Sequence, residues 1–232
     1  MGQRLFALVG LVTAMAFPAW AGEQGRSAVH TMAMEYFESH RSISIDEFLT
    51  QARPEPPSRA ARDAVIASLP QEGELQPKPA ELAKIDAARS VVRYHQRAGV
   101  VTFKVIEVGH AFVGLHARSV LLASRDALLL VSPDEFAALV AHEIAHDYMW
   151  QDYRSAMDRK DYKKMQELEL RFDGIAVLTL RRVGIDPENL VSAIQKVTRF
   201  NQLRDAVATS ARYVPLKERV RFIRTIAGLE WS

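Results

Sequence analysis

The chain has 232 residues, with 30 lysines and arginines against 28 acidic residues and no cysteine. This length suffices for one domain with a sizeable core, and a chain without cysteine has neither disulfides nor a lipid-modified cysteine. Basic residues alternate with acidic ones, as where Arg181 and Arg182 precede Asp186, so we expect no nucleic-acid partner.

Residues 1–21 have the pattern of a signal peptide. A short basic start is followed by an apolar run, Leu5 to Phe17, and Ala19-Trp20-Ala21 matches an A-x-A cleavage site. The run is shorter than the about 20 residues that span a bilayer, and no later stretch is apolar enough. The sequence therefore predicts an exported protein, periplasmic or secreted, that is cleaved near Ala21 and has no transmembrane helix in the mature chain.

Residues 22–79 are predicted to form an N-terminal helical extension and a linker. Apolar residues recur at helical spacing between Ser27 and His40, Ser44 has the properties of a helix cap, and Arg59 to Leu69 suits another helix. Glycine and prolines between Pro70 and Pro79 indicate the linker. Three roles stay open for this region: a cover for the cleft, a removable pro-segment, or a plain helical appendage.

Residues 80–232 are predicted to form the main domain. Ala80 to Ala98 has the pattern of a helix that Gly99 stops. Strands are predicted at Val100 to Val108 and Ser119 to Ala123, with a third around Ala111 to Val113. With the helices that follow, this order predicts an α+β fold that is mainly helical and has a small sheet.

A motif of the form H-E-x-x-H stands in an apolar helical run at residues 142–146. Ser132 and Glu135 predict a capping box at the start of this helix, which is expected to end near Trp150. His142 and His146 fall on one helix face, so both imidazoles can reach one ion. Glu143 points beside that ion, where a carboxylate can take a proton from metal-bound water. This is the arrangement of a zinc hydrolase, and we expect one Zn²⁺ per chain.

Three more helices are predicted after the motif. A polar stretch from Gln151 to Asp161 precedes a long helix at Tyr162 to Val183, which Gly184 ends. The next helix is expected at Asn189 to Leu203 and the last from Pro215 to Leu229.

A catalytic zinc normally takes a third protein ligand. The pattern H-E-x-x-H-x-x-G-x-x-H fails here, because Met149 replaces the glycine and Asp152 the last histidine. Glu169 on the next helix is the better candidate, with Asp173 one turn beyond it to accept the spare N–H of a ligand histidine. Glu167 is a rival ligand, but it has no acid four residues on.

The stretches Glu169-Leu170-Arg171-Phe172-Asp173-Gly174 and Arg182-Val183-Gly184-Ile185-Asp186-Pro187 resemble the E-x-x-x-D and G-x-D-P signature of the gluzincin metallopeptidases related to HtpX and the CAAX prenyl proteases. His110-Ala111-Phe112 stands where that family has an N-A-F turn. The resemblance covers roughly Glu81 to Ile226.

This resemblance implies a zincin-like fold in which a small sheet borders an active-site helix pair. It also implies zinc held by His142, His146 and Glu169, catalysis by Glu143, and an extended peptide bound against an edge strand. Exported relatives tend to act on unfolded or misassembled envelope proteins, so the resemblance suggests a polypeptide substrate and envelope-protein partners.

One departure from the family pattern lies near the C-terminus. Tyr213 stands where the family has a histidine that steadies the oxyanion, before Pro215 and Arg219. A tyrosine hydroxyl can donate the same hydrogen bond, although buried packing is the alternative. We expect Arg219 to pair with an acid near the site.

Together these features predict a zinc metalloendopeptidase, with Glu143 as general base. An alternative is a zincin-fold chaperone or scaffold that binds metal with little turnover. Metal-dependent hydrolysis of a non-peptide substrate is a third possibility.

Overall fold

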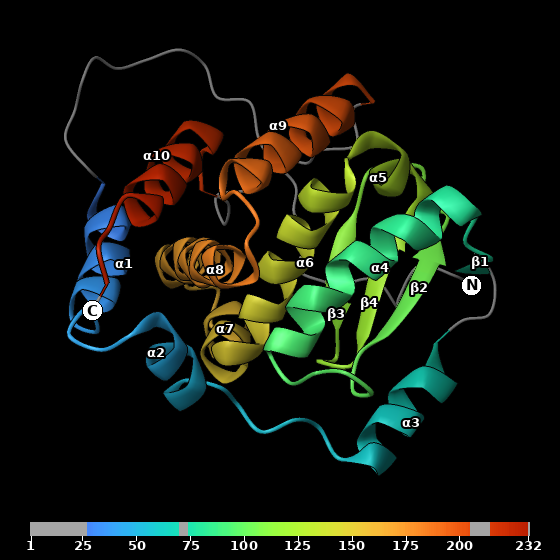
Figure 1. The fold of residues 1–232 in the computed structure, drawn as a ribbon, viewed down its shortest axis with the longest axis horizontal. Helices are drawn as coiled ribbons and strands as arrows, with labels where there is room; N and C mark the ends of the chain where they lie inside the picture. The colour runs from blue at the N-terminus through green and yellow to red at the C-terminus, as the bar shows by residue number, and fades with distance from the viewer. Residues whose placement is uncertain (1–26, 70–73, 205–213, 232) are drawn as a thin grey trace.

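The structure, a computed structural model, describes residues 27–69, 74–204 and 214–231. Helices make up most of this part and four strands form one small mixed sheet, which confirms the predicted mainly helical α+β class (Figure 1). The predicted signal peptide at residues 1–21 lies outside the described residues. None of the described helices combines the length and the apolar character that crossing a membrane requires.

The sheet has the strand order β1-β2-β4-β3. The strands are β1 (Glu74–Leu75), β2 (Thr102–Ile106), β3 (Val113–His116) and β4 (Val120–Ser124). β2 and β4 are parallel, whereas β1 pairs with β2 and β3 pairs with β4 in the antiparallel sense. Every residue of β4 is buried, because the strand is central and has apolar clusters on both faces. β3 is left at the edge of the sheet.

Helix α6 (Pro133–Tyr148) carries the H-E-x-x-H motif through the middle of the molecule. The predicted capping box is confirmed: the Ser132 hydroxyl accepts from the Glu135 backbone N–H at 3.2 Å, and the Glu135 carboxylate accepts from the Ser132 N–H at 2.7 Å. Every residue of α6 from Glu135 to Asp147 is buried, as in a helix that lies within a core. α6 packs against α4 (Pro79–Tyr94), α8 (Tyr162–Val183), α9 (Glu188–Leu203) and β3.

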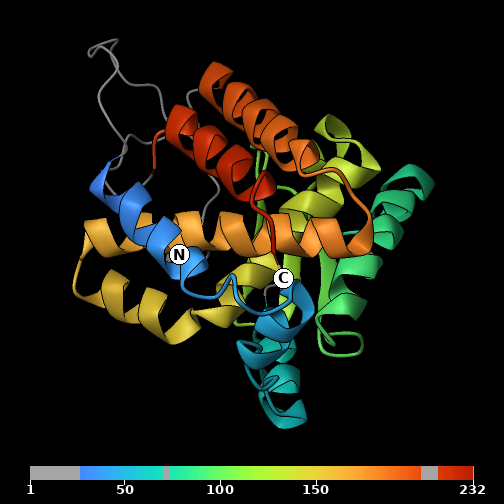
Figure 2. The same ribbon diagram turned by 60° about the vertical axis from the view of Figure 1, so that its left-hand side comes forward.

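Helix α8 (Tyr162–Val183) lies beside α6 and has the predicted bounds. Gly184 ends it with φ of 75°, a left-handed conformation that glycine adopts without steric cost. The helices α9 (Glu188–Leu203) and α10 (Leu216–Ala227) also follow the prediction closely. Figure 2 shows α9 and α10 side by side, with α1 crossing α8.

The N-terminal region contributes three helices, α1 (Ala28–Glu38), α2 (Ile45–Gln51) and α3 (Arg59–Ser68). α1 and α2 pack against α8 and place seven apolar side chains in the main core: Val29, Ala33, Met34, Phe37, Ile45, Phe48 and Leu49. α3 has no buried residue and covers the outer face of the sheet through Val65 and Ile66. Of the predicted extension, α1 and α2 therefore share the core of the main domain, whereas α3 does not.

Four local predictions are wrong. The predicted polar stretch after the motif contains helix α7 (Trp150–Asp158), whose sequence is mostly polar and in which only Ala156 is buried. α4 ends at Tyr94 rather than Ala98, since Gln96 is left-handed with φ of 56°. The third strand begins at Val113, where pairing with β4 starts, and the predicted linker contains β1.

A short helix, α5 (Arg125–Leu130), leads from β4 to α6.

Candidate metal centre

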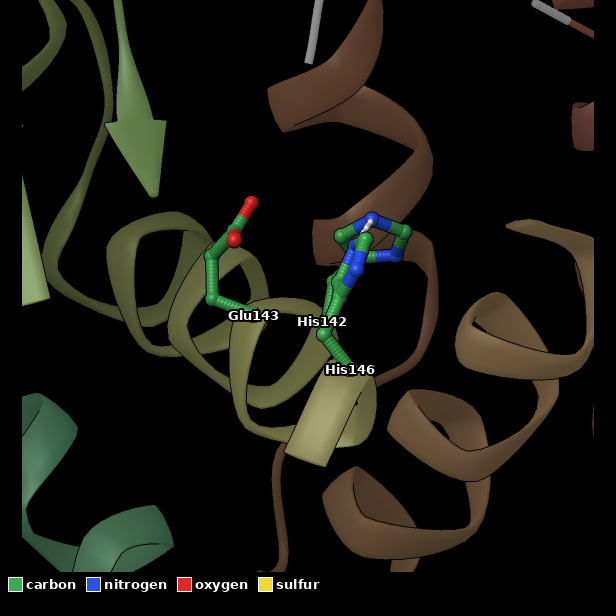
Figure 3. A group of neighbouring side chains, drawn as sticks. All are labelled: His142, Glu143 and His146. Atoms are coloured by element: carbon green, nitrogen blue, oxygen red, sulfur yellow. Dashed lines mark hydrogen bonds between the residues drawn. The ribbon is translucent and has the colours of Figure 1, made fainter. Parts of the chain in front are cut away.

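His142 and His146 converge on one point beside α6. Their Nε2 atoms lie 3.3 Å apart, and the two residues are only 1% and 5% exposed. Figure 3 shows both rings and the Glu143 carboxylate extending from the same side of the helix, with the carboxylate beside the ring pair. Ligand atoms of His142, Glu143 and His146 all lie within 4.8 Å of one another, so this group can hold a metal ion.

Glu143 is held by the edge strand. One carboxylate oxygen, Oε2, accepts a hydrogen bond of 3.0 Å from the backbone N–H of Leu115 on β3. The other oxygen, Oε1, is buried and has no hydrogen-bond partner among the described residues. Burial raises the pKa of Glu143 to about 8, against the lowering effect of the charge on His142. A buried carboxylate with one unpartnered oxygen is suited to accept a proton.

Of the two candidate third ligands, the structure brings Glu169 to the histidines. Its Oε2 atom lies 3.6 Å from His142 Nε2, and its side chain is 13% exposed. Glu167 instead pairs on its own helix with Lys164, at 3.1 Å, and with Arg171. Glu169 is not a member of the group whose ligand atoms all lie within 4.8 Å of one another.

Asp173 and Arg219 form a chain of charges behind His142. Asp173 Oδ1 lies 2.9 Å from His142 Nδ1, and Arg219 donates to both carboxylate oxygens of Asp173, at 2.6 and 2.8 Å. Burial lowers the pKa of His142, but the bond and charge of Asp173 outweigh it and the net pKa is raised. Burial likewise opposes ionisation of Asp173, yet Arg219 holds the pKa of that carboxyl below its usual range. When His142 is neutral, a carboxylate at Nδ1 keeps the proton there and leaves the Nε2 lone pair free for a cation.

Aromatic side chains enclose the second histidine. The Phe172 ring lies 4.0 Å from the His146 ring between centroids, and the Tyr153 ring lies 5.3 Å away and nearly perpendicular. Burial and the charge on His142 lower the pKa of His146 well below its usual value, so its imidazole is neutral and able to bind a metal. Sequence reasoning missed Tyr153 and Leu115, because neither belongs to a motif. The only available signal was the helical spacing of Tyr153, Ala156 and Met157.

The donor set fits zinc. Two nitrogens that each lie about 2.0–2.1 Å from a tetrahedral zinc are about 3.3 Å apart, the distance observed between the two Nε2 atoms. Imidazole nitrogen and carboxylate oxygen are ordinary zinc donors. Tyr213, the residue expected near the oxyanion, lies outside the described residues.

A scan against models of protein families and a search of the curated proteins both find no match to this chain. Its function is therefore inferred from the side chains around α6 and from the resemblance of its motifs.

Proposed function

We propose that this protein is a zinc-dependent endopeptidase with a zincin-like fold, a gluzincin related to HtpX and the CAAX prenyl proteases. In this proposal His142, His146 and Glu169 hold one zinc ion per chain. The main support is the convergence of the two Nε2 atoms at 3.3 Å, with the Glu169 carboxylate 3.6 Å from one of them. The buried, half-unpartnered Glu143 carboxylate beside them supplies a general base.

Each residue has a defined task in peptide hydrolysis. Zinc bound at this site would lower the pKa of a water molecule towards 7 and polarise the peptide carbonyl. Glu143 takes a proton from the attacking water at Oε1 and returns it to the nitrogen of the leaving amine, while the Leu115 N–H keeps Oε2 in place. Asp173, neutralised by Arg219, holds the Nδ1 proton of His142, so that Nε2 stays directed at the cation.

The substrate class is part of the same proposal. β3 is an edge strand directly beside Glu143, and an extended polypeptide can bind such an edge through its main chain. Export, and with it action on unfolded or misassembled envelope proteins, is supported by the signal pattern of residues 1–21 and by the resemblance.

A second candidate is a metal-binding chaperone or scaffold with little turnover. One observation favours it: a cavity beside Glu143 and His146 has a volume of about 10 Å³, room for no more than about one water molecule. The two candidates bind the same metal and differ in turnover.

Replacing Glu143 by Gln separates these candidates. We expect Glu143→Gln to keep its zinc and to lose casein cleavage by at least about 100-fold, because the amide cannot accept the proton. Zinc content by metal analysis and casein cleavage with and without a chelator are measured together. Glu107→Gln, an exposed glutamate away from the motif, is the control and should match the unaltered protein.

An active Glu143→Gln variant would rule out this mechanism. Zinc binding by the unaltered protein without any chelator-sensitive cleavage would favour the chaperone. Activity on small esters or amides alone would indicate a non-peptide hydrolase.

A further inference from the structure

Helix α7 turns one face towards the metal centre. α6 ends at Tyr148, and α7 begins at Trp150 after a single intervening residue. Tyr153, Ala156 and Met157 stand three and four residues apart and so share a helix face, on which Ala156 is fully buried. Tyr153 is the one member of this face with a polar group.

Tyr153 contacts two of the three residues proposed to hold the metal. Its ring meets the His146 imidazole edge-on, at 5.3 Å between centroids and 83° between planes. The same ring lies 5.7 Å from the Phe172 ring, which itself lies 4.0 Å from the His146 ring between centroids. The Tyr153 hydroxyl and the Glu169 carboxylate form a side-chain hydrogen bond. One side chain therefore restrains a ligand from α6 and a ligand from α8.

Tyr153 also lies next to the space in which the reaction would occur. Tyr153 lines the small cavity together with Leu115, Glu143 and His146. The Glu169 side chain is 13% exposed, so its carboxylate can rotate away from the histidines unless another group holds it. A phenol is well suited to this, because it donates one hydrogen bond and stays neutral at ordinary pH.

We propose that Tyr153 is a positioning residue of the metal centre, whose hydroxyl fixes the Glu169 carboxylate and whose ring fixes the His146 imidazole for binding zinc. This inference rests on the proposed function, since it takes Glu169 and His146 as zinc ligands. Partners of metal ligands typically change metal affinity by about 10–100-fold when they are removed.

The test compares zinc affinities of hydroxyl and ring variants of the full chain. Zinc ion is titrated against a chromophoric chelator for the unaltered protein, Tyr153→Phe and Tyr153→Ala, with Glu169→Ala to set the scale for loss of a ligand. Tyr153→Phe keeps the ring and should bind zinc about 10–100-fold more weakly. Tyr153→Ala should bind it more weakly still. Tyr162→Phe, on an exposed residue at the start of α8, is the matched control and should not differ from the unaltered protein.

Excess zinc provides a second measurement. A positioning role predicts that casein cleavage by Tyr153→Phe recovers towards the unaltered rate once zinc is saturating. Zinc affinity within twofold of the unaltered protein would overturn the proposal, as would a loss of kcat that saturating zinc does not restore. If the unaltered protein itself binds no zinc, the proposed function fails; if it binds zinc and cleaves casein while Tyr153→Phe is unchanged, only the role of Tyr153 fails.

Discussion

Each of two buried aspartates, one at the end of α6 and one on the neighbouring helix α8, forms an ion pair with at least one arginine. Asp173 is paired with Arg219, and Asp147, the residue after His146, is paired with Arg97 at 2.7 Å and with Arg118. A buried carboxylate without a partner is destabilising by several kcal/mol, so each acid depends on its arginine. These pairs keep charge next to the candidate metal-binding histidines without destabilising the core.

His95 is buried in the opposite way, as a neutral side chain. Its Nδ1 lies 2.8 Å from the Tyr148 hydroxyl and its Nε2 lies 3.0 Å from the Thr179 hydroxyl. The Thr179 hydroxyl donates its own proton to the Ile175 carbonyl, so Nε2 of His95 is the donor in that contact. Burial lowers the pKa of His95 to about 3, and the charges of Arg53 and Arg97 act in the same direction.

This burial predicts a loss of stability in mild acid. Below a pKa of about 6.5 the unfolded chain binds a proton at His95 that the folded chain does not bind until about pH 3. The free energy of unfolding should therefore decrease as the pH is lowered through this window. His95 should contribute about 1 kcal/mol of this decrease between pH 6 and pH 5. Urea unfolding of the unaltered protein and of His95→Gln, from pH 8 to pH 5, isolates this contribution. The difference in free energy of unfolding between the two proteins should become smaller as the pH is lowered. A difference that stays constant with pH would contradict the prediction.

At the scale of elements, the close crossing of α1 and α8 depends on Gly174. A Cβ atom built at this position would lie 2.3 Å from Phe37 Cζ, and the Phe37 ring is fully buried. Glycine inside a helix is unfavourable by about 1 kcal/mol relative to alanine. The gain from close packing next to Asp173 explains why glycine stands there.

Gly174→Ala should destabilise the protein by about 1–2 kcal/mol, because the overlap with Phe37 outweighs the better helix propensity. Urea unfolding measures the change. In a Phe37→Leu background the same substitution should be less destabilising, since the smaller side chain leaves room for the methyl group. Equal effects in both backgrounds would show that the contact with Phe37 is not the cause.

At the scale of the whole molecule, the N-terminal helices α1 and α2 pack against α8, one of the two helices that carry the candidate metal site. α1 and α2 share the core with α8, and the segment after α2 is held by Arg97, which donates to the Pro54 carbonyl at 2.5 Å, and by Arg118, which donates to the Glu55 carbonyl at 2.6 Å. Both arginines also hold Asp147 at the end of α6. Residues 27–58 therefore have the contacts of a structural part of the fold, and we predict that the rest of the chain depends on them to fold.

A chain that starts at residue 59 should fail to fold. It lacks the seven buried apolar side chains of α1 and α2, whose burial contributes on the order of 10 kcal/mol, as much as the whole stability of a typical domain. Circular dichroism during heating measures cooperative unfolding, and a chain that starts at residue 22 is the control. A cooperative transition in the shorter chain would revive the interpretation as a pro-segment.

Local patterns in the sequence determined the motif helix and the helix after it. Ser132 and Glu135 specify the start of α6, Gly184 specifies the end of α8, and the four-residue spacing of His142 and His146 places both on one face. The same spacing makes Glu169 and Asp173 neighbours on α8. These relations involve residues close in sequence, so helix geometry alone settles them.

Only the tertiary structure decided which groups from distant segments meet these residues. Leu115 contacts Glu143 from an edge strand, and Arg219 contacts Asp173 from α10. Tyr153 contacts His146 from α7, a helix whose mostly polar sequence was not recognised as helical. Such contacts depend on how whole elements pack, and no spacing along the chain encodes them. The sequence by itself therefore determined which residues form the candidate metal site. The groups that orient those residues follow from the packing of β3, α7 and α10 around α6 and α8.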